Sequence, residues 1–570
     1  MHTSARHFID GLLESGIDYL FSNLGTDHVT LVDELAQAQL EGRAAPQVVL
    51  CPHENVAIHM AGGYAAVTGR GQGVMVHVDA GTANAAMGLH NLMRARLPVL
   101  LMAGKSPFSL HGELPGARDN YVHYVQDPFD IGSLVRPYVK WEYNLPSGVV
   151  AKEVLRRAHT VMHSEPAGPV YLTLPRETLI EPWPADRVRS YPAERYGPAQ
   201  QGNLPPEAVQ QVARSLMQAR HPLVITSYLG RKPEAVQALE ALALLCGIRV
   251  VEFSPSWLCI SRESPCFFGF DPAPYLPDTD LGLLLDIDVP WLPHATQPRE
   301  DTQWLHIDVD PIKKDFPMWG FASDARWPAD CATSLRAIHE AVESLADEAF
   351  HARVRERMRS WPDQHTQRRA RWASAAAEAG GTDALNPAWV CAALGRRLAP
   401  EDVVINEGIR NSPAVMQIPR SLPMSFLGGA GGGLGYSAGM ALGVKLARPH
   451  SRVVHIEGDG GFHFSTPSSV YAVSQSYGLP IFTVVLDNGG WQAVKEAVLR
   501  VHPTGGAAKT NQFFARWPGE SRRYDKVAEA FGAHGEWVRH ADEMEPALDR
   551  CFAALEAGRS AVLVASVAKI

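Results

Sequence analysis

The chain has 570 residues, of which 46% are hydrophobic and 20% are charged, and its formal net charge is -9. This length exceeds what one hydrophobic core supports, and at roughly 100 to 200 residues per domain it predicts about three domains. The composition is typical of a compact globular protein, and the sequence has no long Lys/Arg block of the kind that binds nucleic acid.

Cysteine usage and the absence of long apolar runs indicate a compartment. The seven cysteines are scattered and include no CxxC pair, which favours reduced thiols. The start of the chain, MHTSARHFIDGLLESG, lacks a basic region followed by an apolar core, and no apolar run approaches the roughly 18 residues of a membrane span. We therefore expect a soluble cytoplasmic protein with no nucleic-acid or membrane partner.

Helical and β-rich patterns alternate from the N-terminus onward. In the first expected domain, residues 1–188, the helical pattern ARHFIDGLLESG is followed by β-rich runs at 46–51, 73–78, 98–104 and 169–175. Such alternation predicts a parallel sheet covered by helices on both faces. The next segment, 190–207, is rich in Pro, Gly and polar residues and is typical of a linker.

The same alternation returns twice. A central domain is expected at 203–345 and a third domain at 380–570, joined by a charged, helix-prone connection. The predicted fold class is therefore α/β, with three consecutive doubly wound domains and mainly parallel sheets. The β-rich runs of the two later domains are 221–227, 247–253, 281–288, 304–310, DVVINEG, RVVHIEGDG, PIFTVVLDN and AVLVASV.

Polar clusters follow two strands of the third domain. One run ends in Gly458-Asp459-Gly460-Gly461 and the next in Asp487-Asn488-Gly489-Gly490. Ligands of parallel α/β sheets bind at the carboxyl ends of strands, so both clusters are expected at one edge. Glycines there let backbone N–H groups approach phosphate oxygens, and a carboxylate with an amide oxygen suits Mg²⁺. Each cluster alone is also compatible with an ordinary strand-to-helix turn.

Together the clusters resemble the GDG…N motif of thiamine-diphosphate-dependent enzymes. The resemblance implies that Asp459, Asn488 and the Gly490 carbonyl bind Mg²⁺, while Gly460 and Gly461 contact the diphosphate. Two departures stand out. The gap between the GDG cluster and Asn488 is about two residues longer than is commonest in the family, which a longer loop at 465–468 would explain. In addition, Asp487 stands where the family usually has the first of two asparagines. Asp487 either faces the metal or stabilises the strand end.

Glu54 stands at the start of a helical stretch of small residues, CPHENVAIHMAGGYAAVTGRG. Small residues allow close packing, so this acid is expected to be partly buried, where a carboxyl group can shuttle a proton near neutral pH. The plain alternative is an acid at a helix N-terminus. The stretch resembles the HE…A…DGYARxTG segment of the acetohydroxyacid synthase and pyruvate oxidase group, in which the glutamate protonates the aminopyrimidine ring. This resemblance implies that Glu54 is catalytic.

A third stretch, SFLGGAGGGLGYSAGMALGVKLARP, resembles the glycine-rich segment that holds the bent cofactor. It implies cofactor contacts for Leu434 and for the Gly432 carbonyl. The resemblance spans nearly the whole chain in the family's order of pyrimidine-binding, central and diphosphate-binding domains. Family members place the cofactor between the first domain of one subunit and the third domain of another. The resemblance therefore implies a homodimer or homotetramer.

The substrate is less well indicated. The loop NLGTDH and the segment NYVHYVQDPFDIG are expected to border the pocket, with Thr26, His28, His123 and Gln126 as candidate substrate contacts. Neither loop matches the histidine pair or the Phe-Gln pair of better understood branches, and a lone histidine is often a packing residue.

Several reactions remain open. The first is an acetolactate-synthase-like decarboxylation of a 2-oxo acid with ligation of the acyl unit to a second carbonyl, and the alternative is a 2-hydroxyacyl-CoA lyase or a related C–C lyase. DIDVPWLPHATQPRED stands where flavin-binding synthases have Arg-Phe-Asp-Asp, so FAD is not expected. An NAD-dependent or nucleotide-binding enzyme is the rival outside the family, but its GxGxxG arrangement is missing. A non-catalytic relative would be expected to lose Glu54 or Asp459.

Overall fold

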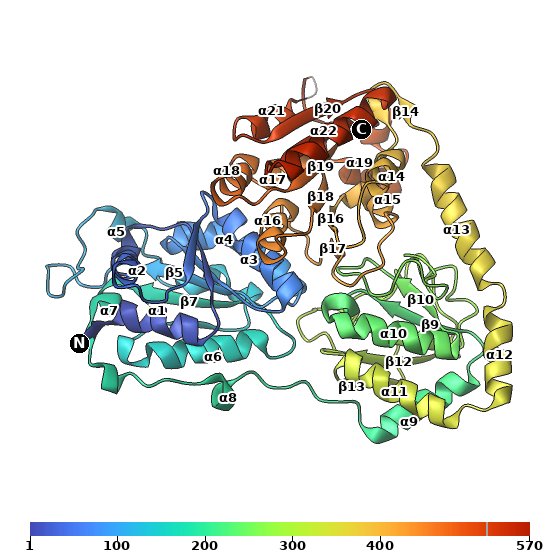
Figure 1. The fold of residues 1–570 in the computed structure, drawn as a ribbon, viewed down its shortest axis with the longest axis horizontal. Helices are drawn as coiled ribbons and strands as arrows, with labels where there is room; N and C mark the ends of the chain where they lie inside the picture. The colour runs from blue at the N-terminus through green and yellow to red at the C-terminus, as the bar shows by residue number, and fades with distance from the viewer. Residues whose placement is uncertain (520–521, 570) are drawn as a thin grey trace. The chain divides into compact units, whose positions relative to one another are not determined.

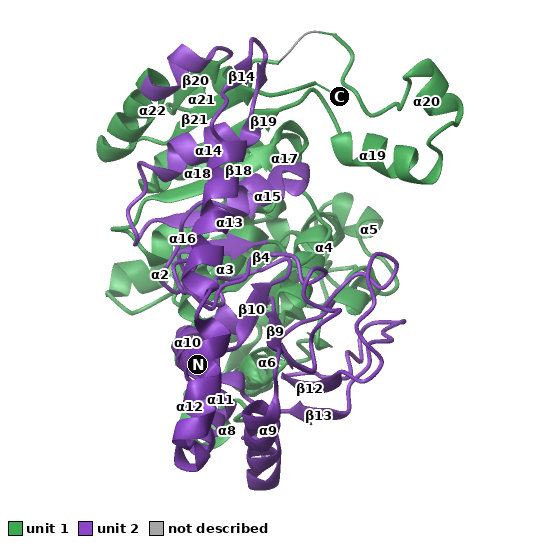
Figure 2. Cartoon of the chain, turned by 90° about the vertical axis from the view of Figure 1, so that its right-hand side faces the viewer, with its two compact units in different colours: residues 1–200, 429–538, 546–570 green, residues 201–428, 539–545 purple. Residues whose placement is uncertain are grey.

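The computed structural model describes residues 1–519 and 522–569. Residues 520, 521 and 570, which fall in the expected third domain, lie outside the described part. The chain divides into two compact units (Figure 2). The first unit contains residues 1–200, 429–538 and 546–570, and the second contains 201–428 and 539–545.

A six-stranded sheet forms the core of the N-terminal part of the first unit. Its strands run parallel in the order β3-β2-β4-β5-β7-β6. The chain turns from β2 outward to β3 and then returns to place β4 on the other side of β2, so the topological switch point lies between β2 and β4. The strands are β2 (Tyr19–Ser22), β3 (Gln47–Leu50), β4 (Gly73–Val76), β5 (Leu100–Lys105), β6 (Glu142–Asn144) and β7 (Val170–Pro175).

Helices cover both faces of this sheet (Figure 1). Helices α1 and α6 bury an apolar stripe that includes Phe8, Leu12 and Leu155 against β-strand side chains such as Met102 and Leu172. Helices α3 and α4 pack on the other face. The helices of this part are α1 (Ser4–Glu14), α2 (Val29–Glu41), α3 (Glu54–Thr68), α4 (Val78–Arg94), α5 (Val122–Val125), α6 (Ala151–His163), α7 (Arg176–Ile180) and α8 (Ala193–Tyr196).

The second unit is built around a five-stranded parallel sheet in the order β10-β9-β11-β12-β13. Its strands β9, β11 and β12 are almost wholly buried, as continuous apolar runs in covered parallel sheets are. The elements are α9 (Pro206–Gln218), β9 (Pro222–Thr226), α10 (Pro233–Cys246), β10 (Arg249–Glu252), β11 (Leu281–Leu285), β12 (Gln303–Asp308), β13 (Ala325–Pro328) and α11 (Cys331–Leu345).

The charged connection forms two helices, as its pattern predicts, and leads into shorter elements of the same unit. Strands β16 and β17 pair in parallel, and β14 and β15 form a small antiparallel ribbon. The elements are α12 (Glu348–Met358), α13 (Trp361–Ala375), β14 (Gly380–Gly381), β15 (Ala384–Leu385), α14 (Pro387–Gly395), β16 (Val403–Glu407), α15 (Ser412–Met416) and β17 (Phe426–Gly428).

The C-terminal part of the first unit places four parallel strands side by side in the order β18-β19-β21-β20. Phe462, Tyr471 and Tyr524 pack with Val485 and Val564 over this sheet. The elements are α16 (Ser437–Ala447), β18 (Val453–Gly458), α17 (Asp459–Phe464), α18 (Pro467–Tyr477), β19 (Phe482–Asp487), α19 (Gln492–Val501), α20 (Gly506–Thr510), α21 (Tyr524–Glu529), β20 (His534–Val538), α22 (Ala541–Glu556) and β21 (Ala561–Ser566).

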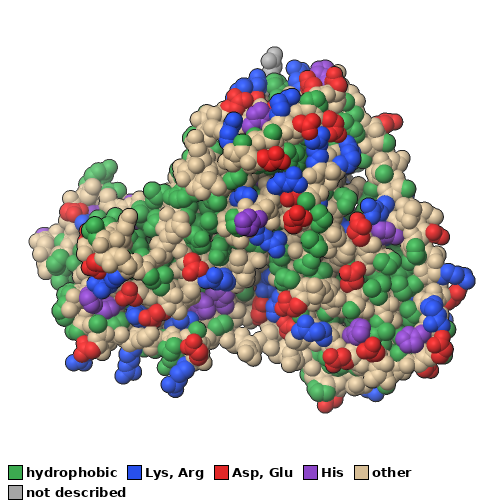
Figure 3. Space-filling model, in the orientation of Figure 1, with side chains coloured by type: hydrophobic (Ala, Val, Ile, Leu, Met, Phe, Trp, Pro, Cys, Tyr) green, Lys and Arg blue, Asp and Glu red, His purple; other side chains and the backbone are tan. Residues whose placement is uncertain are grey.

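The predicted α/β class with mainly parallel sheets is confirmed, and every predicted β-rich run contains a strand. Among the strands that the pattern did not indicate, β2, β6 and β13 are only three or four residues long. Within residues 1–519 and 522–569, no helix combines the length and apolar character needed to cross a membrane. On the face shown in Figure 3, acidic and basic side chains are interspersed.

Candidate active site

Glu54 is the first residue of α3 and its side chain is buried. The two carboxylate oxygens each accept a hydrogen bond from a side-chain amide. Asn23, after β2, donates to Oε1 at 3.0 Å, and Asn84, in α4, donates to Oε2 at 3.0 Å. Glu54 is therefore buried, as predicted. Its surroundings are polar, since two side-chain amides donate to the carboxylate and hold it in one orientation.

An aspartate and a histidine pair at the switch point of the first sheet. Asp27 lies in the loop after β2 and His77 directly follows β4, and His77 Nδ1 hydrogen-bonds Asp27 Oδ1. Asp27 is 1% exposed. Because the carboxyl ends of β2 and β4 are neighbours, two residues that are far apart in sequence meet where α/β sheets bind ligands.

This pairing shifts the pKa of both groups. The hydrogen bond that His77 donates to Asp27 raises the pKa of His77 and outweighs the effect of burial. Burial alone would raise the pKa of Asp27, but the hydrogen bond with His77 and the charges of His77 and His28 lower it. A protonated imidazole and an ionised carboxylate are both favoured, so the pair holds a charged N–H donor next to a compensating carboxylate at the edge of the sheet.

The candidate substrate contacts gather around this pair. Thr26 Oγ1 lies 3.4 Å from His123 Nε2, and the Gln126 side chain helps to raise the pKa of His77. His28 is wholly buried, with Nδ1 accepting from the Gly25 backbone at 3.0 Å and Nε2 lying 3.4 Å from Asp27 Oδ2. Burial lowers the pKa of both His28 and His123. The four residues therefore share one region, and burial favours the neutral form of His28 and His123.

A cavity of about 280 Å³ lies beside the outer strands of the first sheet. Its wall combines the ends of β5, β6 and β7 with the loop that follows Gln126. Its lining includes Lys105, Phe129, Glu142, Asn144 and Thr173.

The second set of candidate residues lies at the carboxyl ends of β18 and β19. These strands are parallel neighbours, with Gly458 beside Leu486. Asp459 begins α17 at the end of β18, and Asn488 follows β19. The structure thus brings Asp459, Gly460 and Gly461 to the same sheet edge as Asn488 and Gly490.

Two carboxylates at this edge repel one another. Burial and the nearby Asp487 raise the pKa of Asp459 to about 6. Asp459 Oδ2 accepts from Trp517 Nε1 at 2.8 Å and Oδ1 from the Gly460 backbone at 3.0 Å, which leaves lone pairs on both oxygens. Among the described residues, none donates a hydrogen bond to the Gly490 carbonyl. Surplus negative charge with oxygen acceptors fits a hard divalent cation.

Asp487 has partners of its own. Lys569 Nζ lies 2.9 Å from its Oδ2, and the Gly489 backbone donates to Oδ1 at 3.0 Å. Of the two readings left open for this residue, these contacts favour the strand-stabilising one. The longer gap before Asn488 coincides with a break between α17 and α18, where Thr466 adopts a left-handed conformation with φ of 55°.

The glycine-rich segment runs from Gly429 into α16. Gly432 is exposed and Leu434 half-buried, and a Cβ at Gly432 would meet open space. Asn55, the neighbour of Glu54, donates through Nδ2 to the Gly435 carbonyl at 3.2 Å and to the Phe464 carbonyl at 3.1 Å. The helix that begins with Glu54 is therefore bonded to the segment expected to hold the cofactor.

Sequence reasoning missed Asn23, Asn84, Asp27 and His77. Asn23 and Asp27 lie in the loop NLGTDH, and His77 closes the β-rich run GVMVHV, so a strand-end position was the available signal. The sequence did not predict the pairing of Asp27 with His77, because this pairing depends on which strands are neighbours in the sheet.

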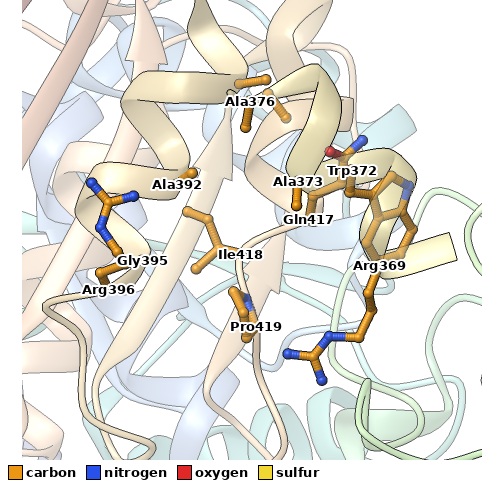
Figure 4. A pocket seen from close by; sticks show the side chains of 12 residues that line it. Arg369, Trp372, Ala373, Ala376, Ala392, Gly395, Arg396, Gln417, Ile418 and Pro419 are labelled. Atoms are coloured by element: carbon orange, nitrogen blue, oxygen red, sulfur yellow. The ribbon is translucent and has the colours of Figure 1, made fainter. Parts of the chain in front are cut away.

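A further cavity, of about 260 Å³, lies among α13, α14 and α15 of the second unit (Figure 4). Its wall is formed largely by alanines, with Trp372 and the arginines Arg369 and Arg396 at its rim. None of the predicted site residues lines it.

Comparison with known proteins identifies the family. Residues 2–134 match the thiamine pyrophosphate enzyme N-terminal TPP binding domain, and residues 413–565 match the corresponding C-terminal TPP binding domain. Together these matches cover half of the chain, and they contain both groups of candidate residues.

Relatives align over nearly the full length. An acetolactate synthase isozyme 3 large subunit of Escherichia coli is 24% identical, covering 97% of this chain and 92% of that protein. A benzoylformate decarboxylase of Pseudomonas aeruginosa is 25% identical, covering 95% of each. A solved thiamine-diphosphate-dependent 4-hydroxybenzoylformate decarboxylase of Rhodococcus jostii shares the fold, with a TM-score of 0.79, 20% identity and coverage of 100% of this chain and 99% of that one. The chain therefore belongs to the family of thiamine-diphosphate-dependent enzymes.

Proposed function

We propose that this enzyme requires Mg²⁺ with thiamine diphosphate, decarboxylates a 2-oxo acid and joins the acyl unit to a second carbonyl compound. The observation that carries the choice of a 2-oxo acid is the His77–Asp27 pair, which favours a protonated imidazole at the carboxyl ends of β2 and β4. The imidazolium N–H that does not face Asp27 is a charged donor suited to the carboxylate of a 2-oxo acid. The relatives named for acetolactate synthesis and benzoylformate decarboxylation support the same substrate class.

The proposed binding of the cofactor rests on residues at the carboxyl ends of β18 and β19. Asp459, Asn488 and the Gly490 carbonyl supply three oxygen ligands for Mg²⁺, which keeps positions open for phosphate oxygens. Gly460 and Gly461, in the first turn of α17, present backbone N–H groups to the diphosphate. The chemistry that thiamine diphosphate supplies when bound is a nucleophilic carbon that also accepts the electron pair left by a departing carboxylate.

The chain's own residues divide the remaining tasks. Glu54 holds and moves a proton at a carboxylate that Asn23 and Asn84 orient. His77 binds the substrate carboxylate, and Asp27 keeps the imidazole charged and fixes its orientation. Thr26, His28, His123 and Gln126 shape the pocket around this pair. The assembly that completes the site is a homodimer or homotetramer, as the family arrangement implies.

The central domain is proposed to hold no flavin. The carboxyl ends of β11 and β12 carry Asp288 and Asp308, which contact the buried Lys313 Nζ at 3.0 and 2.7 Å. Asp288 also accepts from the Tyr228 hydroxyl at 2.6 Å. Acidic side chains in this position repel the phosphates of a dinucleotide. Stoichiometric flavin absorbance in the purified protein would contradict this proposal.

A substrate panel tests the reaction. The purified protein, supplied with thiamine diphosphate and Mg²⁺, is incubated with pyruvate, benzoylformate and other 2-oxo acids, each alone and with an acceptor aldehyde. Release of CO₂, with a 2-hydroxy ketone formed when acceptor is present, is expected. Cleavage of 2-hydroxyacyl-CoA thioesters without CO₂ release from any 2-oxo acid would replace the proposal with the lyase alternative.

A further inference from the structure

The side chain of Asn91, in α4, binds both backbone polar groups of Gly433 in the glycine-rich segment. Its Oδ1 accepts from the Gly433 backbone N–H at 3.0 Å, and its Nδ2 donates to the Gly433 carbonyl at 3.2 Å. A single amide therefore satisfies both polar groups of one residue, 342 positions away in sequence. The preceding residue is also held, because His90 Nε2 accepts from the Gly432 backbone at 3.1 Å.

A buried histidine fixes the orientation of the Asn91 amide. His59 Nδ1 lies 2.9 Å from the Asn55 carbonyl, to which it must donate, so its Nε2 is an acceptor. Asn91 Nδ2 lies 3.2 Å from that Nε2. Burial lowers the pKa of His59 to about 4, so the ring stays neutral and the acceptor is kept at physiological pH. Asn91 cannot flip its amide without placing Oδ1 against this acceptor.

Only glycine is compatible with such close approach. A Cβ at Gly433 would lie 2.3 Å from the Met87 sulfur, and one at Gly431 would lie 2.4 Å from Asn91 Oδ1. Gly432 between them faces open space. Asn91 therefore holds the backbone of the segment from one side, while the open side at Gly432 stays available to a ligand.

The residue that follows Gly433 is Leu434, and it lies between two held peptides. Gly433 is bound by Asn91 from α4, and the Gly435 carbonyl accepts from Asn55 of α3. Two helices of the N-terminal part of the unit thus set the position of a side chain in the C-terminal part. Its freedom to move along the segment is limited at both ends.

We propose that Asn91 is a positioning residue for thiamine diphosphate, which fixes Gly432 and Leu434 where they meet the ring portion of the cofactor. The inference rests on the proposed cofactor contacts of these two residues, and not on the proposed substrate. Without the Asn91 amide, both polar groups of Gly433 lose their partner and the segment must be ordered by the cofactor itself. Loss of such supporting contacts commonly weakens binding by about 10-fold to 100-fold.

The test compares two ligands on the intact protein without substrate. Binding of thiamine diphosphate and of inorganic pyrophosphate, each with Mg²⁺, is measured by calorimetry or by quenching of tryptophan fluorescence, since Trp517 touches Asp459. Asn91→Ala should weaken thiamine diphosphate by about 10-fold or more. It should leave pyrophosphate within about twofold, because the diphosphate half depends on Asp459 and Asn488.

Asn91→Asp provides a second variant of nearly the same shape. It keeps the acceptor for the Gly433 N–H but loses the donor to the Gly433 carbonyl and to His59, so it should also weaken thiamine diphosphate selectively. Asn203→Ala, at an exposed position, is the control. Unchanged affinity for thiamine diphosphate in both Asn91 variants, or an equal loss for both ligands, would overturn the proposal.

Discussion

Glu54 carries the clearest prediction at the scale of single residues. Replacing it with Gln keeps the side-chain shape but removes the group that exchanges a proton, so turnover should fall by about 100-fold or more. Thiamine diphosphate should still bind, because the diphosphate contacts lie elsewhere. Steady-state kinetics and cofactor titration check both statements, with the exposed Glu401→Gln as control. Full activity of Glu54→Gln would exclude the proposed proton transfer.

The Asp27–His77 pair predicts a pH dependence of stability. The pKa of His77 is raised in the folded state, so its contribution is complete below its ordinary value of about 6.5 and is lost as the pH rises through the raised pKa. The pKa of Asp27 is lowered, so its contribution is lost as the pH falls through that lowered value. The pair therefore stabilises the fold most between about pH 4 and 6.5.

Asp27→Asn should remove this pH-dependent contribution. The difference in the free energy of unfolding between wild type and variant should shrink by about 1 kcal/mol from pH 6 to pH 9, because the imidazole loses the charge that pairs with the Asp27 carboxylate. Urea unfolding at both pH values measures it. In a His77→Gln background the same substitution should show no such change, and a pH-independent difference in the wild-type background would refute the pairing of charges.

His77 is also predicted to act on substrate affinity. Replacing it with Gln removes the positive charge proposed to bind the 2-oxo acid, so KM for that acid should rise by about 10-fold, equivalent to a lost contact of about 1.4 kcal/mol. The affinity for thiamine diphosphate should stay unchanged. Kinetics over a series of 2-oxo acids separate the two effects, and a variant that loses cofactor affinity with an unaltered KM would point to a structural role.

At the scale of elements, the contact between α3 and α16 joins the two parts of the first unit. The helices cross so closely that a Cβ at Gly443 would lie 2.0 Å from the Met60 carbonyl oxygen, which belongs to the backbone and cannot rotate away. This contact lies along the helix that begins with Glu54 and beside the segment that holds Leu434. The spacing between α3 and α16 therefore affects the position of Glu54 and that of Leu434.

Gly443→Ala should therefore force the two helices apart. We expect a loss of about 1 to 3 kcal/mol in the free energy of unfolding, the usual cost of overpacking, together with weaker cofactor binding. Thermal unfolding measures the first effect. Gly506→Ala is a matched helical control, since nothing lies within 4 Å of its Cβ position. An equal change in both variants would show that helix propensity, not the crossing, is responsible.

At the scale of the whole molecule, the arrangement of sites across subunits is testable by mixing variants. Glu54→Gln and Asp459→Asn should each be inactive alone. If the first part of one chain works with the third part of another, a mixed dimer contains one intact site. Random mixing should then restore about a quarter of wild-type activity, since half of the dimers are mixed and one of their two sites is intact. Continued inactivity would place each site within one chain.

Cofactor binding should also be visible as stability of the whole protein. A ligand present at 100 times its Kd stabilises the folded state by about 2.7 kcal/mol. Thiamine diphosphate with Mg²⁺ should therefore raise the melting temperature, and a chelator should reverse the gain. The Asp459→Asn variant should lose most of this shift, because it lacks the only carboxylate among the three proposed metal ligands. A shift of wild-type size in that variant would rule out Asp459 as a ligand.

Much of the architecture follows from the sequence alone. Alternating helical and β-rich patterns indicate parallel α/β sheets, because apolar runs bounded by turns form buried strands. Polar clusters after two such runs predict that Asp459 and Asn488 lie at one sheet edge, and they do. Glu54 is recognisable because an acid precedes a run of small residues that only close packing explains.

Only the tertiary structure decided which residues meet. His77 and Asp27 are 50 positions apart and pair because β4 lies beside β2, an order that no local pattern specifies. Asn91 and Gly433 are 342 positions apart in the sequence, and they meet because α4 packs against the glycine-rich segment. Strand identity depends on local side-chain periodicity, whereas strand order and helix packing depend on long-range burial. For this reason the candidate residues Glu54, Asp459 and Asn488 could be selected from the sequence, and the contacts around them could not.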